Sequence, residues 1–267
     1  MKTAKKKVTP KEAPSVINEI LVNVVLDRSG SMSSCRDSTI GGYNEYLNTL
    51  RADHNAKYSV SLIQFDKPGS EEGSEPELMV CYLDKPLADV PDLTKETYEP
   101  RGMTPLYDAI GETIRRIGER AKGRPVLNVI ITDGMENASK EFSQQGIKAL
   151  LHTKQKEGWT FVFLGANIDS YKVIFSLGIH AQNVSNYDTA NVTSMFQNLG
   201  ASTRCYASTR METGEARQVL GEEFFTDAQR QEMEAQTVGT GKPGGAGAPP
   251  TPFRVPKWNI TSQAVKP

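Results

Sequence analysis

The chain has 267 residues, enough for one large domain or for a domain of about 200 residues followed by a tail. Its formal net charge of −1 excludes the basic surplus of a general nucleic-acid binder, so we expect no nucleic-acid partner. The three cysteines show no CxxC spacing, which argues against a disulfide framework or zinc site and indicates a reducing compartment. No apolar run reaches the ~18 residues of a membrane span and no secretory signal is recognisable, so we expect a cytoplasmic protein without membrane contact.

Strand-like and helix-like segments alternate along the first half of the chain. Ile20–Leu26 is the first predicted strand, and its continuous apolar character is typical of a strand buried on both faces. A helix is predicted at Thr39–Leu50, although two glycines weaken its first turn. Tyr58–Phe65 and Leu78–Leu83 are the next two strands. The turn-forming segment between them favours a hairpin, which would make one strand antiparallel.

The second half continues the alternation. Thr104 and Pro105 are residue types favoured at the N-cap and first position of a helix, which we expect to run to about Arg120. The most apolar strand follows at Pro125–Ile131. The remaining predicted elements are a helix at Ser143–Lys156, a strand at Trp159–Leu164, a short helix at Ser170–Leu177, an edge strand at Ala181–Val184 and a helix at Asn191–Tyr206. This order predicts an α/β fold with a doubly wound, mostly parallel sheet, one antiparallel edge strand and helices on both faces.

Composition divides the chain into four parts. We assign residues 1–17 to a basic flexible arm, 18–210 to the α/β domain, 211–236 to a helical extension with a short helix in Phe225–Ala235, and 237–267 to a Gly/Pro-rich linker and tail. The linker cannot bury enough apolar surface to become ordered. The final stretch, TPFRVPKWNITSQAVKP, is either a disordered tail or a linear motif that docks on this domain or a partner.

Oxygen-bearing side chains follow the ends of two predicted strands. Asp27, Ser29 and Ser31 stand at spacing i, i+2, i+4 after the first strand. Asp133 follows the strand that ends near Ile131, and Thr104 precedes the helix between the two. In open α/β sheets, ligands bind at the carboxyl edge where the strand order reverses. Two carboxylates and three hydroxyls suit Mg²⁺ better than zinc or copper. The alternative is that these residues only form turns and cap a helix.

This set of residues resembles the von Willebrand factor type A (vWA) domain and its metal-ion-dependent adhesion site (MIDAS). The first motif of that site, Asp-x-Ser-x-Ser, stands at residues 27–31 as DRSGS, and the family's threonine and later aspartate match Thr104 and Asp133. The resemblance covers about residues 18–210. It is particularly close to stand-alone bacterial and phage members of the family, which share the runs DRSGSM, TIGGYN, TDGMEN and FLGANID. No ligand position departs from the pattern, so the resemblance implies an intact MIDAS.

The resemblance implies a binding module that depends on a metal ion. Ser29, Ser31 and Thr104 would hold Mg²⁺ directly, with Asp27 and Asp133 acting directly or through water, and Mn²⁺ or Ca²⁺ as alternative ions. An open coordination position would then accept an Asp or Glu carboxylate from a partner protein. The partner implied is an AAA+ ATPase of the MoxR type, for which the chain would be an adaptor. The alternatives are a structural component of a phage particle or other assembly anchored by its tails, with a bacterial host cytoplasm as location, and a stress-response protein of the tellurium-resistance type.

No catalytic set is recognisable, and we expect no enzymatic activity. A phosphatase of the haloacid-dehalogenase type would need a second aspartate where Ser29 stands. No Gly-rich phosphate loop with a lysine occurs. A serine hydrolase needs a histidine base, but His54, His152 and His180 lie away from the ligand loops.

Four residues beside the ligand positions have two open roles each. Glu136 and Asn137 either hydrogen-bond metal-bound waters or cap a helix or turn. Arg28 and Arg101 either point away from the metal or steer an acidic partner toward it.

Overall fold

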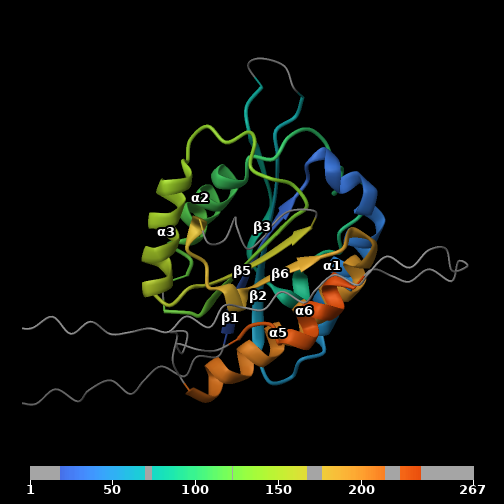
Figure 1. Ribbon diagram of the computed structural model, residues 1–267. Coiled ribbons are helices and arrows are strands. Elements are labelled where there is room, and N and C mark those ends of the chain that lie inside the picture. Colours follow the sequence, from blue (N-terminus) through green and yellow to red (C-terminus); the bar gives the residue numbers. More distant parts are fainter. Residues whose placement is uncertain (1–18, 70–73, 122, 167–175, 214–222, 236–267) are drawn as a thin grey trace, which may run out of the picture. The chain divides into compact units, whose positions relative to one another are not determined.

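The computed structural model describes residues 19–69, 74–121, 123–166, 176–213 and 223–235. Within these ranges six strands form one sheet in the order β3-β2-β1-β4-β5-β6 (Figure 1). The strands are β1 (Glu19–Asp27), β2 (Lys57–Asp66), β3 (Glu77–Pro86), β4 (Val126–Thr132), β5 (Thr160–Ala166) and β6 (Val184–Tyr187). β3 pairs antiparallel with β2 at one edge, and the other neighbouring strands are parallel. The predicted fold class is confirmed.

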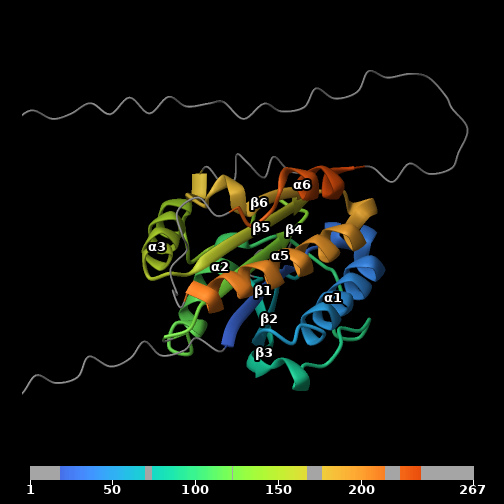
Figure 2. The same cartoon turned by 90° about the horizontal axis from the view of Figure 1, so that it is seen from below.

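Helices cover both faces of the sheet (Figure 2). The helices described are α1 (Arg36–Arg51), α2 (Leu106–Ile117), α3 (Gln144–Lys156), α5 (Val192–Thr213) and α6 (Asp227–Glu234). α1 and α5 pack on one face and α2 and α3 on the other, while α6 packs against α5 and β6. Short 3₁₀ turns lie at Gly30–Cys35, Leu87–Asp89, Ala181–Asn183 and Thr189–Asn191. None of the helices described is both long and apolar enough to cross a membrane.

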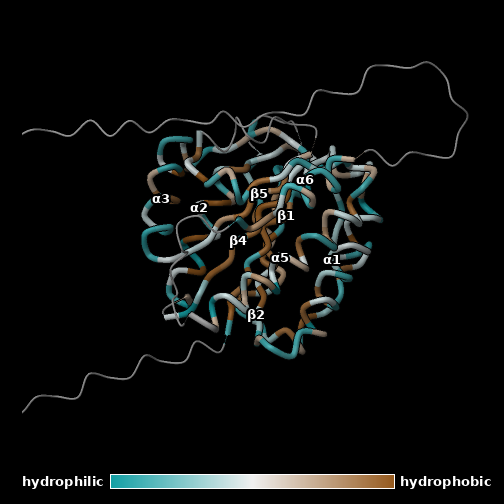
Figure 3. Tube along the Cα trace, turned by 60° about the horizontal axis from the view of Figure 1, so that its bottom comes forward, coloured by the Kyte–Doolittle hydropathy of each residue, from teal (hydrophilic) through white to brown (hydrophobic). Residues whose placement is uncertain are grey.

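The two layers of helices create two hydrophobic cores, and the central strands contribute to both. β1 alternates between them, with Ile20, Val22, Val24 and Leu26 in one core and Leu21 and Val25 in the other. Because both faces are covered, the strand is apolar at every position from Ile20 to Leu26 except Asn23, as its sequence indicates. Figure 3 shows the same pattern as a hydrophobic trace through the central strands.

Gly42 brings α1 and α5 close together. A Cβ atom at this position would lie 2.3 Å from the Phe196 ring of α5, which is therefore packed directly over the helix backbone. Tyr43 and Tyr46 of α1 place their ring centroids 6.3 and 6.5 Å from the same ring. The glycine lowers the intrinsic stability of the helix, but the aromatic contacts that it permits help to stabilise α1 in place. The helix begins at Arg36, ahead of the predicted Thr39.

The start of α2 differs from its prediction. The helix runs from Leu106 to Ile117, so Thr104 is not its N-cap and the helix ends before Arg120. The first-turn N–H groups bond instead to a loop that lies about thirty residues further along the chain. The Tyr107 N–H donates to the Glu136 carboxylate at 2.9 Å, and the Asp108 N–H donates to the Ser139 hydroxyl at 3.1 Å. This cap is provided by tertiary structure, and a local sequence pattern could not indicate it.

The C-terminal half contains the other differences. The edge strand predicted at Ala181–Val184 is β6 at Val184–Tyr187, because residues 181–183 form a 3₁₀ turn. α5 continues seven residues beyond the predicted end at Tyr206, to Thr213. The helix expected in Phe225–Ala235 is α6. The described residues do not include most of the predicted helix at 170–177, the basic arm at 1–17 or the tail at 237–267. The division of the chain into four parts therefore stays a prediction.

Candidate metal site

The sheet brings the predicted ligand residues to one place at its carboxyl edge. β1 and β4 are adjacent parallel strands, and the chain turns to opposite sides of the sheet after each of them. Asp27 is the last residue of β1, and Asp133 follows the last residue of β4. Both carboxylates therefore lie at the point where the strand order reverses, the position at which open α/β sheets bind ligands.

Hydrogen bonds connect the side chains at this point. The Ser31 hydroxyl donates to Oδ1 of Asp133 at 2.5 Å, and the hydroxyl oxygens of Ser29 and Ser31 are 3.2 Å apart. Asp27 accepts two hydrogen bonds, from the Ser29 N–H at 2.6 Å and from the Thr132 hydroxyl at 2.5 Å. The Asp-x-Ser-x-Ser loop and the end of β4 thus form one bonded group.

Thr104 is held beside this group by the loop that follows β4. Its N–H donates to the Asn137 side-chain oxygen at 2.8 Å, and its carbonyl accepts from the Asn137 N–H at 3.1 Å. A Cβ atom at Gly134 would lie 2.8 Å from the Thr104 hydroxyl oxygen, so this hydroxyl is adjacent to the residue after Asp133. Asn137 fixes the backbone of a predicted ligand, whereas Glu136 caps α2. All five predicted positions are therefore gathered at one edge.

Backbone hydrogen bonds join the first loop to the segment before Thr104. The Gly30 N–H donates to the Gly102 carbonyl at 3.0 Å, and the Arg101 N–H donates to the Arg28 carbonyl at 2.7 Å. Gly102 has a φ of +68°, a conformation that glycine adopts without strain. Sequence reasoning missed Gly102, Asn137 as an anchor and Thr132. The only available signal for Thr132 was its place directly before an aspartate in the motif TDG.

The two carboxylates are buried, and no described residue provides a counter-charge. Asp27 is fully buried and Asp133 is 5% exposed. Within the described residues neither forms an ion pair with a lysine, arginine or histidine. Burial raises the pKa of Asp27 to about 7 and also raises the pKa of Asp133. Since an ionised carboxylate is costly to bury unpaired, a cation at this edge would stabilise both.

The donor set fits a hard cation. Its side-chain donors are two carboxylates and three hydroxyls, and oxygen is the preferred ligand of Mg²⁺, Mn²⁺ and Ca²⁺. Among the described residues no group of three or more His, Cys, Asp or Glu side chains is placed to hold a metal ion. That result accords with a site in which serine and threonine are three of the five predicted ligand residues. Ser29 and Thr104 are buried, and Ser31 is exposed and open to a ligand.

Metal binding should strengthen as the pH rises from 6 to 8. With a pKa of about 7, Asp27 is mostly protonated at pH 6 and mostly ionised at pH 8, which alone changes the affinity for Mg²⁺ by on the order of tenfold. The folded pKa lies above the unfolded value of 3.8, so without metal this group stabilises the fold most below pH 3.8 and loses that contribution as the pH rises through 7. Thermal unfolding in EDTA and in excess Mg²⁺ at pH 6, 7 and 8 measures both effects. An equal rise in Tm on adding Mg²⁺ at all three pH values would contradict this prediction.

Arg28 is not available to steer a partner. It is 5% exposed, and its guanidinium donates to the Asp66 carboxylate at 2.9 Å. Arg101 has a side chain that is 44% exposed and bonds to the same carboxylate. The three histidines are exposed and lie outside the ligand loops.

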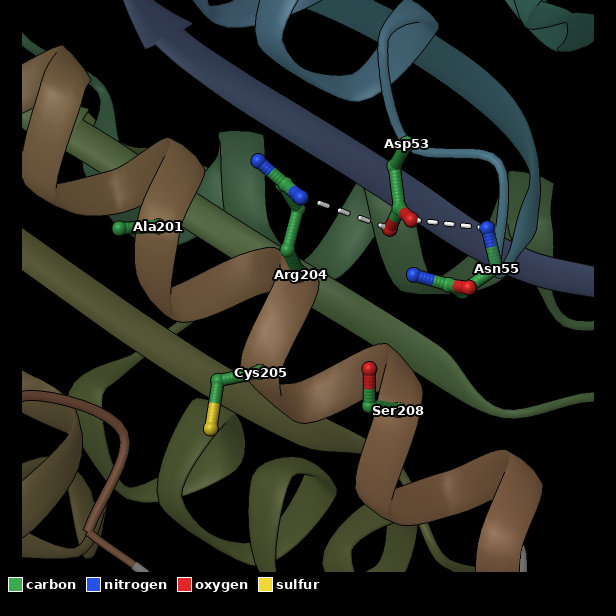
Figure 4. Close-up of a pocket in the computed structure, with 6 residues that line it drawn as sticks. All are labelled: Asp53, Asn55, Ala201, Arg204, Cys205 and Ser208. Carbon is green, nitrogen blue, oxygen red and sulfur yellow. Dashed lines mark hydrogen bonds and ion pairs between the residues drawn. The ribbon is translucent and has the colours of Figure 1, made fainter.

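A separate hollow of about 320 Å³ lies between α5 and the turn that joins α1 to β2 (Figure 4). Its lining residues are Asp53, Asn55, Ala201, Arg204, Cys205 and Ser208. The Asp53 carboxylate accepts from the Asn55 N–H at 2.9 Å and lies 3.9 Å from the Arg204 guanidinium. None of the five predicted ligand residues lines this hollow, so it is distinct from the candidate metal site.

No protein-family model matches this chain, and no curated protein sequence matches it. Solved structures do match its fold. The vWF domain of the type V pilus tip protein Mfa5 from Porphyromonas gingivalis has a TM-score of 0.52 at 9% identity, over 72% of this chain and 97% of that chain. The pilus adhesin SpaC from Lactobacillus rhamnosus GG has a TM-score of 0.54 at 12% identity, over 72% of this chain and 30% of the adhesin.

A third match is proximal thread matrix protein 1 from the mussel byssus, with a TM-score of 0.50 at 14% identity over 70% of this chain. The match spans about half of that protein chain, 47% of its length. At these identities the likeness concerns the fold alone. The chain therefore has the fold of a von Willebrand factor type A domain, as shown by its sheet order, by the helices on both faces and by these structural matches.

Proposed function

We propose that this chain is a protein-binding module whose binding depends on a metal ion held at an intact MIDAS. The observation that carries the proposal is the pair of buried carboxylates, Asp27 and Asp133, which have no cationic partner among the described residues. They lie at the same edge of the sheet as the hydroxyl side chains of Ser29, Ser31 and Thr104. Open α/β sheets bind ligands at this same edge, which supports the proposal.

Ser29, Ser31 and Thr104 would hold the ion through their hydroxyl oxygens, and Asp27 and Asp133 would act directly or through water. The Ser31 hydroxyl donates a hydrogen bond to Asp133, which leaves the lone pairs of the hydroxyl oxygen available for an ion. Both oxygens of Asp27 already accept hydrogen bonds, which favours contact through water for this residue. Mg²⁺ is the ion we propose, with Mn²⁺ or Ca²⁺ as alternatives, and when bound it supplies an exchangeable position for a partner carboxylate.

The partner is a protein that presents an Asp or Glu side chain. We propose an AAA+ ATPase of the MoxR type as the first candidate, with no nucleic acid or membrane involved and no catalysis by this chain. The exposed Ser31 marks the side from which a carboxylate reaches the site. A structural component of a phage particle is the alternative, and there the contacts would not need an ion.

A capture experiment tests the proposed function. The full chain, immobilised, should retain its partner in Mg²⁺ and release it in EDTA, and Thr104→Val should retain none, because it removes a ligand oxygen at nearly constant volume. Thr153→Val is the matched control, since the Thr153 hydroxyl bonds only the carbonyl of Ala149 on the surface of α3. Replacing the acidic residues of the captured protein one at a time should then identify one whose loss abolishes capture. Equal retention in EDTA and by Thr104→Val would refute the proposal.

A further inference from the structure

A third strand-terminal carboxylate lies at the same edge of the sheet and is not part of the ligand set. Asp66 is the last residue of β2, and its side chain is fully buried. One of its oxygens accepts from the Arg28 guanidinium at 2.9 Å, and the other accepts from Nε of Arg101 at 2.8 Å. Glu77, at the start of β3, forms ion pairs with both arginines and is half-exposed. Two acids and two arginines thus form one closed network.

The two arginines belong to the loops that carry predicted metal ligands. Arg28 stands between Asp27 and Ser29, and Arg101 lies three residues before Thr104. The Arg101 N–H also bonds the Arg28 carbonyl, so the two segments are in contact. Like charges repel strongly where water is excluded, and unpaired guanidinium groups here would oppose the binding of a divalent cation.

We propose that Asp66 and Glu77 make the site selective for a cation by neutralising Arg28 and Arg101. Their two negative charges balance the two guanidinium groups, and the ion pairs hold those groups at the β2–β3 side of the loops. The carboxylates of Asp27 and Asp133, which have no ion-pair partner among the described residues, would then supply the negative charge that attracts an ion. Asp66 acts through the arginines and is a positioning residue. The inference rests on the proposed function and adds four residues to the account of its metal site.

The alternative role for this network is purely mechanical, as a clamp that holds the two loops together. The two roles predict opposite effects for the loss of Arg101. If the positive charge of Arg101 opposes the cation, removing this guanidinium raises the affinity for the cation. The same change then restores the affinity that is lost when Asp66 is replaced. If the network is only a clamp, replacing either Asp66 or Arg101 lowers the affinity for the cation, and replacing both does not restore it.

Titration calorimetry with Mn²⁺ and Mg²⁺ on the full chain separates these outcomes. Asp66→Asn should weaken binding by on the order of tenfold, the usual range for a group that supports a metal ligand. Arg101→Gln should bind about threefold more tightly than wild type, and Asp66→Asn with Arg101→Gln should return to within about threefold of wild type. Asp84→Asn is the matched control, because Asp84 forms an ion pair with Arg124 at 2.7 Å at the opposite end of the sheet. This variant should bind both metal ions with the affinity of the wild type.

Circular dichroism and thermal unfolding establish that each variant is folded. Should Asp66→Asn fail to fold, Glu77→Gln at the half-exposed end of the network takes its place. Its affinity for the metal ion should be about threefold lower than that of the wild type, and adding Arg101→Gln should reverse this loss. Unchanged affinity in the acid variants, or weaker binding by Arg101→Gln, overturns the inference and leaves the proposed function standing. Absence of metal binding by the wild type overturns both.

Discussion

Replacing Asp27 with alanine should abolish the binding of Mg²⁺ and Mn²⁺, which the intact chain is expected to bind at about one ion per chain. Asp27 supplies one of two carboxylates at the site, and it also organises the loop by accepting from the Ser29 N–H and the Thr132 hydroxyl. Replacing it removes a negative charge and the two hydrogen bonds that organise the loop. The affinity for the metal ion should therefore fall by more than about 100-fold, which exceeds the usual effect of losing a residue that only supports a ligand. Titration calorimetry on the two proteins measures this directly.

Asp53→Ala is the matched control for this experiment. Asp53 is also a buried carboxylate, 6% exposed, and accepts from the Tyr58 hydroxyl at 2.6 Å. It lines the hollow beside α5 and not the carboxyl edge, so its loss should leave metal binding intact. If the intact chain binds no ion, the fold stands, the Asp27 loop is a turn, and the structural role in an assembly becomes the better hypothesis.

Gly102→Ala should destabilise the protein by about 3 kcal/mol or more, because two effects add at this position. The residue has a φ of +68°, which an L side chain rarely adopts. In addition, a Cβ atom would lie 1.9 Å from the Lys67 carbonyl oxygen, a backbone atom that cannot move alone. The segment must shift, and the bond from Gly30 N–H to the Gly102 carbonyl should be lost with it. Denaturant unfolding gives the change in the free energy of unfolding.

Gly123→Ala separates the two effects. Gly123 has a φ of +75°, but a Cβ atom there would meet nothing within 4 Å. This variant should therefore lose only the conformational term, about 1 kcal/mol. If Gly102→Ala lowers the free energy of unfolding no more than Gly123→Ala does, the contact with Lys67 is relieved at little cost. Metal binding should weaken in Gly102→Ala alone, since Gly123 lies before β4 at the other end of the sheet.

Features that depend on burial pattern were predictable from the sequence. β1 is apolar at consecutive positions because its two faces enter two different cores, and such a strand can be recognised without knowing its neighbours. The convergence of Asp27 and Asp133 followed from one further rule, that parallel strands end at the same edge. The resemblance to vWA domains supplied Thr104, which no local pattern would have joined to the two aspartates.

Features that depend on contacts between distant segments were not predictable. The first turn of α2 is capped by Glu136, and Thr104 is anchored by Asn137, in both cases from a loop about thirty residues away. Asp66 also follows a predicted strand, but that position could not show its role, because the two arginines that it binds belong to other segments of the chain. The sequence therefore predicts which side chains would hold an ion, and the structure shows which residues position those side chains.

The bonds that join the three loops involve protein atoms alone. Gly30 is hydrogen-bonded to Gly102, Arg101 to Arg28 and Thr104 to Asn137. The conformational entropy of these segments is consequently lost when the chain folds. A cation bound at the proposed site would then have little left to order, and preorganisation of this kind favours affinity. On that proposal the edge of the sheet would be a preformed receptor, and recognition would require no disorder-to-order transition of these segments.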